Sequence, residues 1–251
     1  MSILCYHAVD PCWSSPLSVT PEAFDEHLAL LARSRTVVPL HVAVEHLDAR
    51  GRLPRGMVAL TFDDGFQQLE EHVFPSLARH GLPATLFLVA ATLTPEGQPV
   101  DWVDTPPPDR QLETLDVDAV LAARDQGIDI GSHTWSHPRL TELDEDDCLA
   151  EMTRSRELLG DLLHERVDHL AYPRGLHDAT ARRSAEQAGY THSFTLPQAR
   201  EDVGRHALPR VGIFPGNGAL AVRVKTQPSY VRARMSPVFP AVRSVARRIR
   251  P

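Results

Sequence analysis

Leu60-Thr61-Phe62-Asp63-Asp64-Gly65 is the stretch around which the chain is organised. An apolar run that begins at Met57 ends here in two adjacent carboxylates and a glycine. Because successive side chains of a strand point in opposite directions, one aspartate can bind a cation while its neighbour accepts a proton. The same residues are equally typical of a turn that ends a strand and caps the next helix. The choice between a hydrolytic site and a plain turn therefore depends on the rest of the chain.

The composition is that of an ordinary soluble protein. Of the 251 residues, 42% are hydrophobic and 24% are charged, and the net charge of −7 with neutral histidines gives no indication of nucleic-acid binding. Cys5, Cys12 and Cys148 are odd in number and form no CxxC pair, which favours a reducing compartment. The sequence has no signal-peptide pattern and no stretch long enough to span a membrane, so we expect a cytoplasmic location.

Short apolar runs alternate with amphipathic segments along residues 1–214. Some amphipathic segments carry helix-end signals, such as Thr20 followed by Pro21, or Gly51 after a last turn. The expected strands are 3–9, 36–40, 57–62, 84–90, 128–130, 167–172, 190–195 and 207–214, and the longer expected helices are 66–80, 116–126, 144–164 and 178–188. Such alternation implies parallel βαβ units, and this many units favour one α/β domain with a barrel or barrel-like sheet.

A second polar motif, Ser132-His133-Thr134-Trp135-Ser136-His137, follows another expected strand. Two histidines four residues apart can bind one cation if the segment forms a helical turn. In a parallel α/β fold the C-terminal ends of the strands meet on one face, where ligands collect. Asp64, His133 and His137 would then be three protein ligands of one metal ion, with open positions for water and substrate.

Leu170-Ala171-Tyr172-Pro173-Arg174-Gly175 follows a third expected strand, and the three motifs together resemble the polysaccharide deacetylase superfamily (NodB homology, carbohydrate esterase family 4). The first family motif, Thr-Phe-Asp-Asp-Gly, is intact at Thr61–Gly65, and a looser form of the second spans His133–His137. The resemblance covers about residues 3–213. It is strongest to a branch that deacetylates exopolysaccharides and opens with a segment similar to Tyr6-His7.

The resemblance implies a distorted (β/α) barrel of about seven parallel strands that removes acetyl groups from N-acetylhexosamine units of a polysaccharide or glycan precursor. It implies a divalent metal ion, commonly zinc, bound by Asp64, His133 and His137. The ion would activate a water and polarise the acetyl carbonyl, while Asp63 accepts the proton of that water as general base. A backbone N–H near Pro173-Arg174 would complete the oxyanion site.

The residue that protonates the leaving group departs from the family pattern. Many members use a histidine near the C-terminus, but the matching region, Ala207–Ile213, contains none. The first and last strands of a closed barrel are neighbours, so we predict that His7 is the general acid. A buried structural role is the alternative for His7, and His206 is the second candidate acid.

The third motif also departs from the pattern. Where relatives often have an arginine earlier in the motif and a tyrosine after the proline, this chain has Ala171 and Arg174. Arg174 would either replace the missing guanidinium beside Asp63 or contact substrate. Two other functions stay open. The protein could be an O-acetyl carbohydrate esterase, since the same site attacks either carbonyl, or it could be a glycan-binding pseudoenzyme.

Residues 94–111 are rich in Pro, Asp and Gly and are expected to form a surface loop over the site. Trp102 in this loop, and Trp135 in the second motif, are candidates for stacking on a sugar ring or for ordinary packing. Residues 215–251 are expected to form a basic tail outside the barrel, with Val238, Val242, Val245 and Ile249 at helical spacing. An amphipathic helix here would contact an anionic membrane surface or a partner; a helix packed on its own barrel, or a frayed tail, is the alternative.

Overall fold

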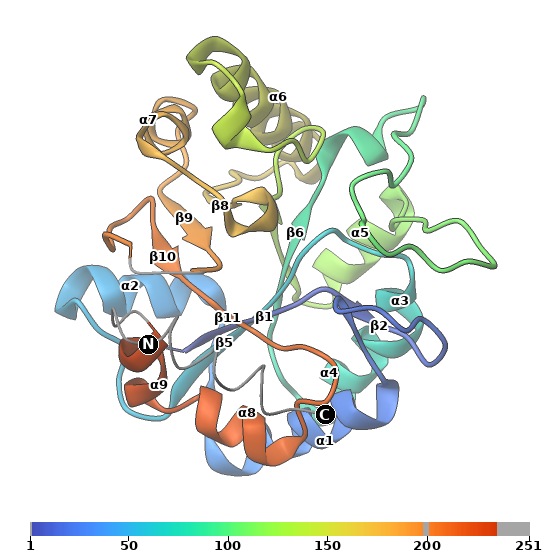
Figure 1. The fold of residues 1–251 in the computed structure, drawn as a ribbon, viewed down its shortest axis with the longest axis vertical. Coiled ribbons are helices and arrows are strands. Elements are labelled where there is room, and N and C mark those ends of the chain that lie inside the picture. The colour runs from blue at the N-terminus through green and yellow to red at the C-terminus, as the bar shows by residue number, and fades with distance from the viewer. Residues whose placement is uncertain (1, 198–200, 235–251) are drawn as a thin grey trace, which may run out of the picture.

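The structure is a computed structural model and describes residues 2–197 and 201–234. A sheet of parallel strands lies at its centre, and helices surround the sheet (Figure 1). The strands of the sheet are β1 (Ile3–Tyr6), β5 (Met57–Phe62), β6 (Thr85–Leu88), β7 (Asp129–Ser132), β8 (His169–Ala171), β9 (His192–Thr195), β10 (Leu208–Pro209) and β11 (Val211–Gly212). Their spatial order is β10-β9-β8-β7-β6-β5-β1-β11.

The sheet nearly closes into a barrel at β10 and β11. These two strands are halves of one extended segment separated by Arg210. The first half pairs with β9, where Leu208 lies opposite Phe194, and the second half pairs with β1, where Val211 lies opposite Leu4. The two ends of the strand order are therefore joined by a single residue. The predicted distorted (β/α) barrel is confirmed, with eight strands by these bounds.

Three short strands lie outside this order. β4 (Thr36–Val37) pairs with β5, and β2 (Ala8–Val9) pairs with β3 (Ser18–Val19) in a separate two-stranded sheet. The expected strand 3–9 is thus interrupted at His7, where the chain leaves the barrel. The interruption matters because it leaves the His7 side chain at the end of β1 rather than inside a continuous strand.

Most of the helices follow the expected segments. They are α1 (Pro21–Ser34), α2 (Leu40–Arg50), α3 (Gln68–His72), α4 (Phe74–His80), α5 (Val117–Asp125), α6 (Glu145–Leu163), α7 (Ala179–Gln187), α8 (Ala219–Lys225) and α9 (Pro228–Arg234), with 3-10 turns η1 (Ala90–Leu93), η2 (Leu140–Glu142) and η3 (Pro173–Gly175). Thr20 caps α1, since its hydroxyl oxygen accepts a hydrogen bond from the N–H of Ala23 at 3.3 Å.

The expected single helix 66–80 is wrong. The segment forms two short helices, α3 and α4, and Phe66 instead makes an isolated bridge to Thr114. Pro75 explains the break, because a proline lacks an N–H and is tolerated only in the first turn of a helix, which is where it lies in α4. This bridge joins the turn after β5 to Thr114, which lies three residues after the 94–111 loop.

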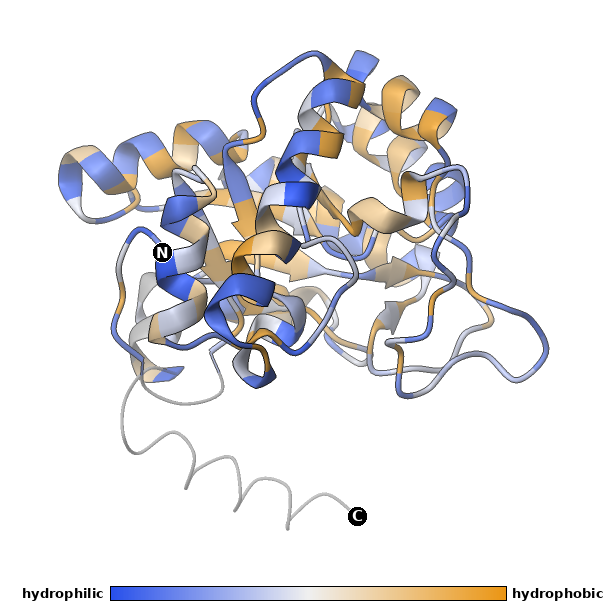
Figure 2. Ribbon diagram, turned by 90° about the horizontal axis from the view of Figure 1, so that it is seen from above, coloured by the Kyte–Doolittle hydropathy of each residue, from blue (hydrophilic) through white to orange (hydrophobic). Residues whose placement is uncertain are grey.

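The strands and the helices that surround them carry many hydrophobic residues (Figure 2), and buried hydrophobic side chains form the core. One buried cluster inside the barrel includes Ile3, Phe87 and Phe194 and continues onto α2. A larger cluster lies under the other helices and contains Tyr6 and Phe62, whose stacked rings have centroids 5.3 Å apart. Each buried aromatic ring contributes roughly 1.5–3 kcal/mol of hydrophobic free energy, so this packing holds β1 and β5 in register.

The chain continues as packed structure beyond the last strand. α8 lies against α1 (Figure 1), where Val222 is buried and the Arg35 guanidinium donates a hydrogen bond to the Thr226 hydroxyl at 3.1 Å. The predicted amphipathic segment around residues 238–250 lies outside the described residues. Among the helices that the structure describes, none combines the length and hydrophobicity needed to cross a lipid bilayer.

Candidate active site and metal centre

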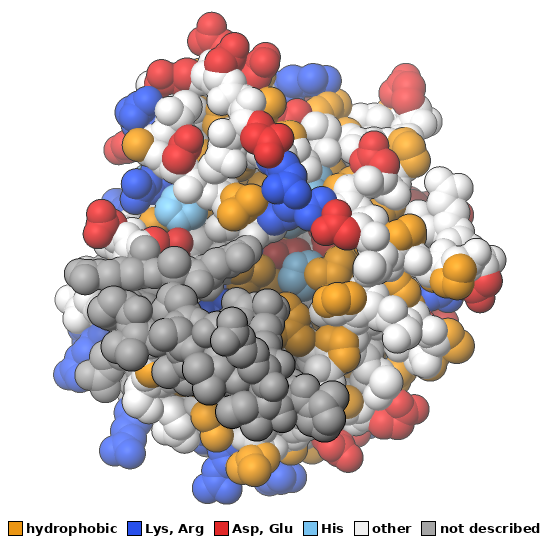
Figure 3. All heavy atoms as spheres, viewed as in Figure 1, with side chains coloured by type: hydrophobic (Ala, Val, Ile, Leu, Met, Phe, Trp, Pro, Cys, Tyr) orange, Lys and Arg blue, Asp and Glu red, His pale blue; other side chains and the backbone are white. Residues whose placement is uncertain are grey.

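The polar side chains predicted from sequence come together at one end of the barrel. They follow the C-terminal ends of different strands, which lie at the same end of a parallel barrel. A pocket of about 640 Å³ opens over them and is lined by His7, Asp64, Trp102, His137 and Arg174, among others. Figure 3 shows this face hollowed, with a histidine side chain at the bottom of the hollow.

Asp64, His133 and His137 form a buried group whose ligand atoms lie within 4.8 Å of one another. The distance from Asp64 Oδ1 to His137 Nε2 is 3.4 Å, and that to His133 Nε2 is 3.8 Å. Tetrahedral ligands at ordinary zinc bond lengths lie about 3.3–3.4 Å apart. One carboxylate and two imidazoles with this spacing therefore fit a small divalent ion.

Neighbouring groups fix the orientation of these three side chains. The Nδ1 atom of His133 lies 2.7 Å from the carbonyl oxygen of Ala171 and donates to it, which leaves Nε2 with its lone pair. The indole N–H of Trp102 donates to Asp64 Oδ1 at 3.0 Å, and its ring stacks on His137 with centroids 5.0 Å apart. Trp102 thus supports two of the candidate ligands directly, a role that the sequence analysis did not consider.

The protonation states also suit a metal centre. Burial lowers the pKa of His133, and it lowers the pKa of His137 to about 2, so both rings are neutral at pH 7. Burial and the nearby Asp63 charge raise the pKa of Asp64 to about 8. A carboxyl group held in this way loses its proton readily only when a cation takes the proton's place.

The histidines meet through a loop rather than the helical turn that their spacing suggested. Thr134 and His137 adopt left-handed backbone conformations, with φ of 70° and 60°, and the hydroxyl oxygen of Thr134 accepts a hydrogen bond from the N–H of His137 at 3.1 Å. Asp64 has φ of 70° as well. Non-glycine residues rarely adopt this conformation, and here it is concentrated among the candidate ligands.

Gly65 is required by the same turn. Its φ is 67°, and a Cβ atom at this position would lie 2.5 Å from Leu88 Cδ2. The two consecutive left-handed residues, Asp64 and Gly65, turn the chain sharply after β5. The Asp-Asp-Gly sequence is therefore both a turn and part of a site, so the two alternatives raised by the sequence do not exclude each other.

Asp63 is held by Arg210, which the sequence analysis did not identify. The Nη1 and Nη2 atoms of Arg210 donate to Asp63 Oδ1 and Oδ2 at 2.6 and 2.7 Å, and both side chains are buried. Burial by itself would raise the pKa of Asp63, but the Arg210 charge outweighs it and holds this pKa well below its usual range. Asp63 is therefore ionised at every pH near neutrality.

Arg174 does not take the place beside Asp63 that one of its two predicted roles required. Its guanidinium donates to the Asp104 carboxylate at 3.0 and 3.2 Å and to the carbonyl oxygen of Trp102 at 2.7 Å. Its φ of 58° places it in the left-handed region, and its side chain lines the pocket. Arg174 thus connects the turn after β8 to the 94–111 loop and remains in reach of a ligand.

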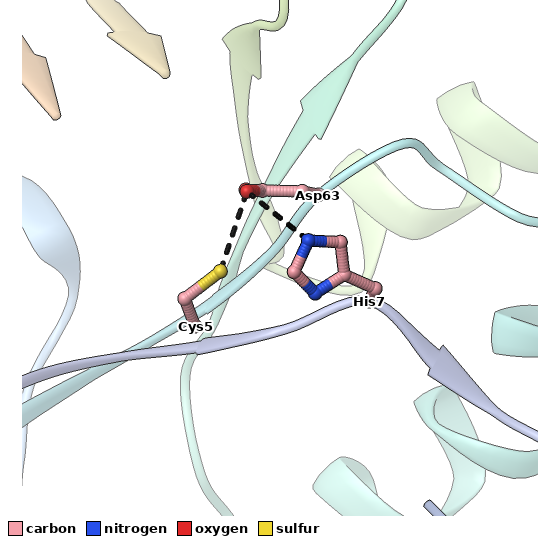
Figure 4. Close-up of side chains that lie close together, drawn as sticks. All are labelled: Cys5, His7 and Asp63. Atoms are coloured by element: carbon pink, nitrogen blue, oxygen red, sulfur yellow. Dashed lines mark hydrogen bonds and ion pairs between the residues drawn. The ribbon is translucent and has the colours of Figure 1, made fainter. Parts of the chain in front are cut away.

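His7 and Cys5 both point toward Asp63 (Figure 4). His7 Nε2 lies 3.9 Å from Asp63 Oδ2, and the Cys5 thiol donates to the same oxygen at 3.3 Å. Burial lowers the pKa of His7 to about 4, in spite of the neighbouring carboxylate. The ligand atoms of Cys5, His7 and Asp63 also lie within 4.8 Å of one another.

This second cluster is less suited to a cation than the first. Arg210 already occupies both oxygens of Asp63 with a fixed positive charge. Burial raises the pKa of the Cys5 thiol well above its ordinary value, which disfavours the thiolate that binds metals. A cation is therefore expected at Asp64, His133 and His137, with Asp63 beside it as an ionised carboxylate.

Two other predicted candidates lie apart from this group. The His206 ring bonds to the Ser193 hydroxyl at 3.1 Å, near the start of β9 and thus toward the other end of the barrel. Trp135 packs against the larger hydrophobic cluster, and the Arg154 guanidinium lies 4.0 Å above its ring. The packing role, rather than stacking on a sugar, agrees with the position of Trp135.

The comparisons with known proteins identify the family of the chain. A family model for polysaccharide deacetylase matches residues 50–193, which is more than half of the chain. YxkH of Bacillus subtilis, which carries the polysaccharide deacetylase name, is 26% identical over 220 residues, covering 86% of this chain and 72% of that protein. Poly-beta-1,6-N-acetyl-D-glucosamine N-deacetylase of Escherichia coli K12 is 34% identical over 133 residues, covering 48% of this chain and 18% of that enzyme.

Solved structures share the same fold. The deacetylase PplD of Streptococcus pyogenes has a TM-score of 0.77 and 21% identity, covering 91% of this chain and 98% of that chain. IcaB from Ammonifex degensii has a TM-score of 0.73 and 24% identity, covering 90% of this chain and 96% of that chain. At these identities the structures show the fold, and the family model shows the family. The chain belongs to the polysaccharide deacetylase family.

Proposed function

We propose that the protein is a metal-dependent hydrolase that removes acetyl groups from N-acetylhexosamine units of a polysaccharide or glycan precursor. The observation that carries this proposal is the placement of Asp63, ionised by Arg210, directly beside the buried group of Asp64, His133 and His137. The name of the Escherichia coli relative makes N-acetylglucosamine the first sugar to test. The match covers less than a fifth of that enzyme's length, so its particular polymer is a separate question.

Asp64, His133 and His137 would hold the divalent ion, with zinc as our first choice. When bound, such an ion lowers the pKa of a water and polarises the acetyl carbonyl. Asp63 accepts the proton of the attacking water, and Arg210 keeps its carboxylate ionised and fixed in place for this step. The Cys5 thiol adds a weaker hydrogen bond to the same carboxylate.

His7 is assigned as the acid that protonates the leaving amine. Because its pKa is about 4, His7 is neutral before the reaction and has to gain a proton during it. Asp63 is a suitable source, since its pKa lies below that of His7 and it therefore gives up a proton readily. The gap of 3.9 Å between Asp63 Oδ2 and His7 Nε2 is short enough to close to hydrogen-bond distance when substrate fills the pocket.

The N–H of Arg174 is our candidate for the oxyanion donor. Pro173 has no N–H, and the N–H groups of Gly175 and Leu176 bond to the carbonyl oxygens of Tyr172 and Pro173 within the turn. Gly175 keeps this turn tight, because a Cβ atom there would lie 2.4 Å from the backbone nitrogen of Leu196. A rigid donor of this kind stabilises charge as it develops on the carbonyl oxygen.

O-acetyl ester hydrolysis is the second candidate activity, and the low pKa of His7 is the observation that favours it. An alcohol leaving group needs less protonation than an amine. An enzyme whose acid residue is mostly unprotonated is therefore slowed less on ester substrates than on amide substrates. The metal ligands and the base would act identically on both kinds of substrate. The choice between the two activities therefore depends on the efficiency of proton delivery by His7.

Metal analysis of the purified protein, combined with acetate release from N-acetylglucosamine oligomers and from O-acetylated xylan, tests the proposal. We expect about one divalent ion per chain and a loss of about 10²–10⁴-fold in acetate release for Asp63→Asn. The Asp161→Asn variant, changed at a surface carboxylate of α6, is the control for charge removal. A protein that binds no divalent metal, or a fully active Asp63→Asn variant, would contradict the mechanism, and inactivity with bound metal would favour a glycan-binding pseudoenzyme.

A further inference from the structure

Phe214 and Tyr230 give the pocket an aromatic wall that the proposed mechanism does not use. Both side chains line the same pocket of about 640 Å³ as His7 and His137. Phe214 follows β11 and Tyr230 belongs to α9, so both come from the segment after the last strand of the barrel. The match to the family model ends at residue 193, and this aromatic wall therefore lies outside the part of the chain that the match covers.

The Phe214 ring lies directly against the end of β11. Gly212 has no side chain, and a Cβ atom there would lie 2.5 Å from Cζ of the Phe214 ring. Gly212 lies opposite Cys5 of β1, and the N–H of Ile213 donates to the carbonyl oxygen of Cys5 at 2.8 Å. In this register Phe214 comes level with His7, since each lies two residues further along its own segment.

Hydrogen bonds fix the backbone that carries Phe214. The amide oxygen of Asn217 accepts from the N–H of Phe214 at 3.1 Å and from the Lys225 ammonium at 2.5 Å. The same ammonium donates to the carbonyl oxygen of Gly212 at 2.7 Å and lies 5.1 Å from the centroid of the Phe214 ring. His27, buried on α1, donates to the carbonyl oxygen of Asn217 at 2.5 Å. Because these contacts already fix the turn, little conformational entropy is lost when a ligand packs on the ring.

The position of Phe214 level with His7 indicates which part of the substrate the aromatic wall meets. In the proposed mechanism the acetyl carbonyl faces the metal-binding group, and His7 protonates the nitrogen of the leaving amine. That nitrogen is attached to the sugar ring, so the ring lies on the His7 side of the pocket. A pyranose ring has an apolar face of C–H groups, and a large, flat aromatic side chain is well shaped to pack on such a face.

We propose that the aromatic wall packs on the pyranose ring of the acetylated unit, with Phe214 as the residue that selects a sugar as the leaving group. The inference rests on the proposed deacetylase function and specifies how that function recognises its substrate. A small ester such as ethyl acetate presents the same carbonyl to the metal-binding group but has no ring to pack on Phe214. The two substrates should therefore differ in their dependence on this residue.

Acetate release from a trimer of N-acetylglucosamine and from ethyl acetate, measured with the full-length, metal-loaded protein, tests the proposal. We expect Phe214→Leu to raise KM for the trimer by about three- to tenfold, with a smaller change in kcat, because the flat aromatic face is lost while an apolar side chain remains. The ratio of kcat/KM for the trimer to that for ethyl acetate should fall by a similar factor, and Phe214→Tyr should keep this ratio. Val203→Ala removes an exposed apolar side chain that does not line the pocket and should leave the ratio unchanged.

Phe214 also packs on Gly212, so each variant is checked for an unchanged thermal unfolding midpoint and metal content before its kinetics are interpreted. If Phe214→Leu does not fold, Tyr230→Leu tests the same wall from a different helix and should lower the ratio in the same direction. Equal losses on the trimer and on ethyl acetate would overturn the proposal, because Phe214 would then support the site without contacting the sugar. An unchanged ratio in folded Phe214→Leu would overturn it as well.

Binding without turnover separates failure of this inference from failure of the proposed function. A trimer of glucosamine carries no acetyl group, and calorimetry should show that it binds more weakly to Phe214→Leu than to the unmodified, metal-loaded protein. Binding that depends on Phe214 in a protein that releases no acetate would contradict only the proposed function. Acetate release from both substrates without any dependence on Phe214 would contradict only the inference.

Discussion

At the scale of single residues, the Asp63–Arg210 pair has the largest expected effect on stability. Both side chains are buried and joined by two hydrogen bonds of 2.6 and 2.7 Å. Removing one member of such a pair leaves the other as an uncompensated buried charge, at a cost of about 3–5 kcal/mol. We therefore expect Arg210→Met to lower the free energy of unfolding by this amount at pH 7, measured by urea denaturation. The double variant Arg210→Met/Asp63→Asn should recover a large part of the loss.

The same pair predicts that lowering the pH has opposite effects on the stability of the unmodified protein and of the Arg210→Met variant. In the metal-free protein the folded pKa of Asp63 is depressed, so its contribution to stability is present above the unfolded pKa and is lost as the pH falls. Without Arg210, burial dominates and raises the folded pKa, so protonation of Asp63 should stabilise the variant. Urea unfolding between pH 7 and pH 4 should show the stability deficit of Arg210→Met shrinking toward acid. A constant deficit would contradict this account of the pair.

Arg210 also shows why part of the site could not be predicted from the sequence. The motifs at Asp63, Asp64, His133 and His137 are local, so their chemistry is readable from residue type and spacing. The pairing of Arg210 with Asp63 joins residues 147 positions apart and depends on barrel closure. The available signal was a charged residue inside an otherwise apolar strand, since an arginine is almost never fully buried without a partner.

At the scale of elements, the 94–111 loop is held over the site by a few polar contacts. Arg174 bonds to Asp104 and to the carbonyl oxygen of Trp102, and Trp102 in turn bonds to Asp64. At a second point the Trp13 indole donates to the carbonyl oxygen of Thr105 at 2.9 Å. Because one of these contacts ends on a candidate metal ligand, we expect the position of the loop to be coupled to metal binding.

Arg174→Ala is expected to loosen this loop without unfolding the barrel. We expect faster hydrogen exchange in residues 94–111, a rise of several-fold in KM, and a change below about 1 kcal/mol in global stability, because the Asp104 carboxylate of this ion pair is exposed to solvent. Asp104→Ala should have a smaller effect, since the bond from Arg174 to the Trp102 carbonyl remains. Arg139→Ala is the control at another exposed arginine. An equal effect of Arg139→Ala would show that charge alone is responsible.

Elements with strong local signals were predicted best. The strand 57–62 has the expected bounds, and Thr20 caps α1 as its sequence indicated. The helix expected over 66–80 was wrong, because Pro75 breaks it, and left-handed residues bring His133 and His137 together through a loop instead of a helical turn. Periodicity reports which face of a segment is buried, but it does not report such local conformations.

At the scale of the whole molecule, charge is distributed unevenly along the chain. The last 49 residues, Val203–Pro251, contain no acidic side chain. Within the described part of this region, Leu220 and Val224 on α8 are 75% and 50% exposed, on either side of Arg223. Apolar and basic side chains on one exposed surface are the combination that adsorbs to anionic membranes. The proposed membrane contact therefore has a candidate site on α8 in addition to the residues beyond 234.

Co-sedimentation with vesicles tests this contact. We expect the full-length protein to bind vesicles that contain anionic lipid, to bind neutral vesicles weakly, and to be released as salt is raised. Leu220→Ser/Val224→Ser should weaken binding, and removal of residues 235–251 should weaken it further. Equal and negligible binding of all variants to anionic vesicles would contradict the contact, leaving the surface to another role.

The closure of the barrel at Arg210, between β10 and β11, affects when the site is completed as the chain folds. During synthesis the chain emerges from its N-terminus, so Asp63, the proposed base, is made 147 residues before the arginine that pairs with it. Until β10 and β11 are added, the first and last strands cannot be joined and the base has no fixed partner. Completion of the barrel and ionic pairing of the proposed base are thus one event, and we expect a nascent or prematurely terminated chain to carry the candidate metal ligands without a working site.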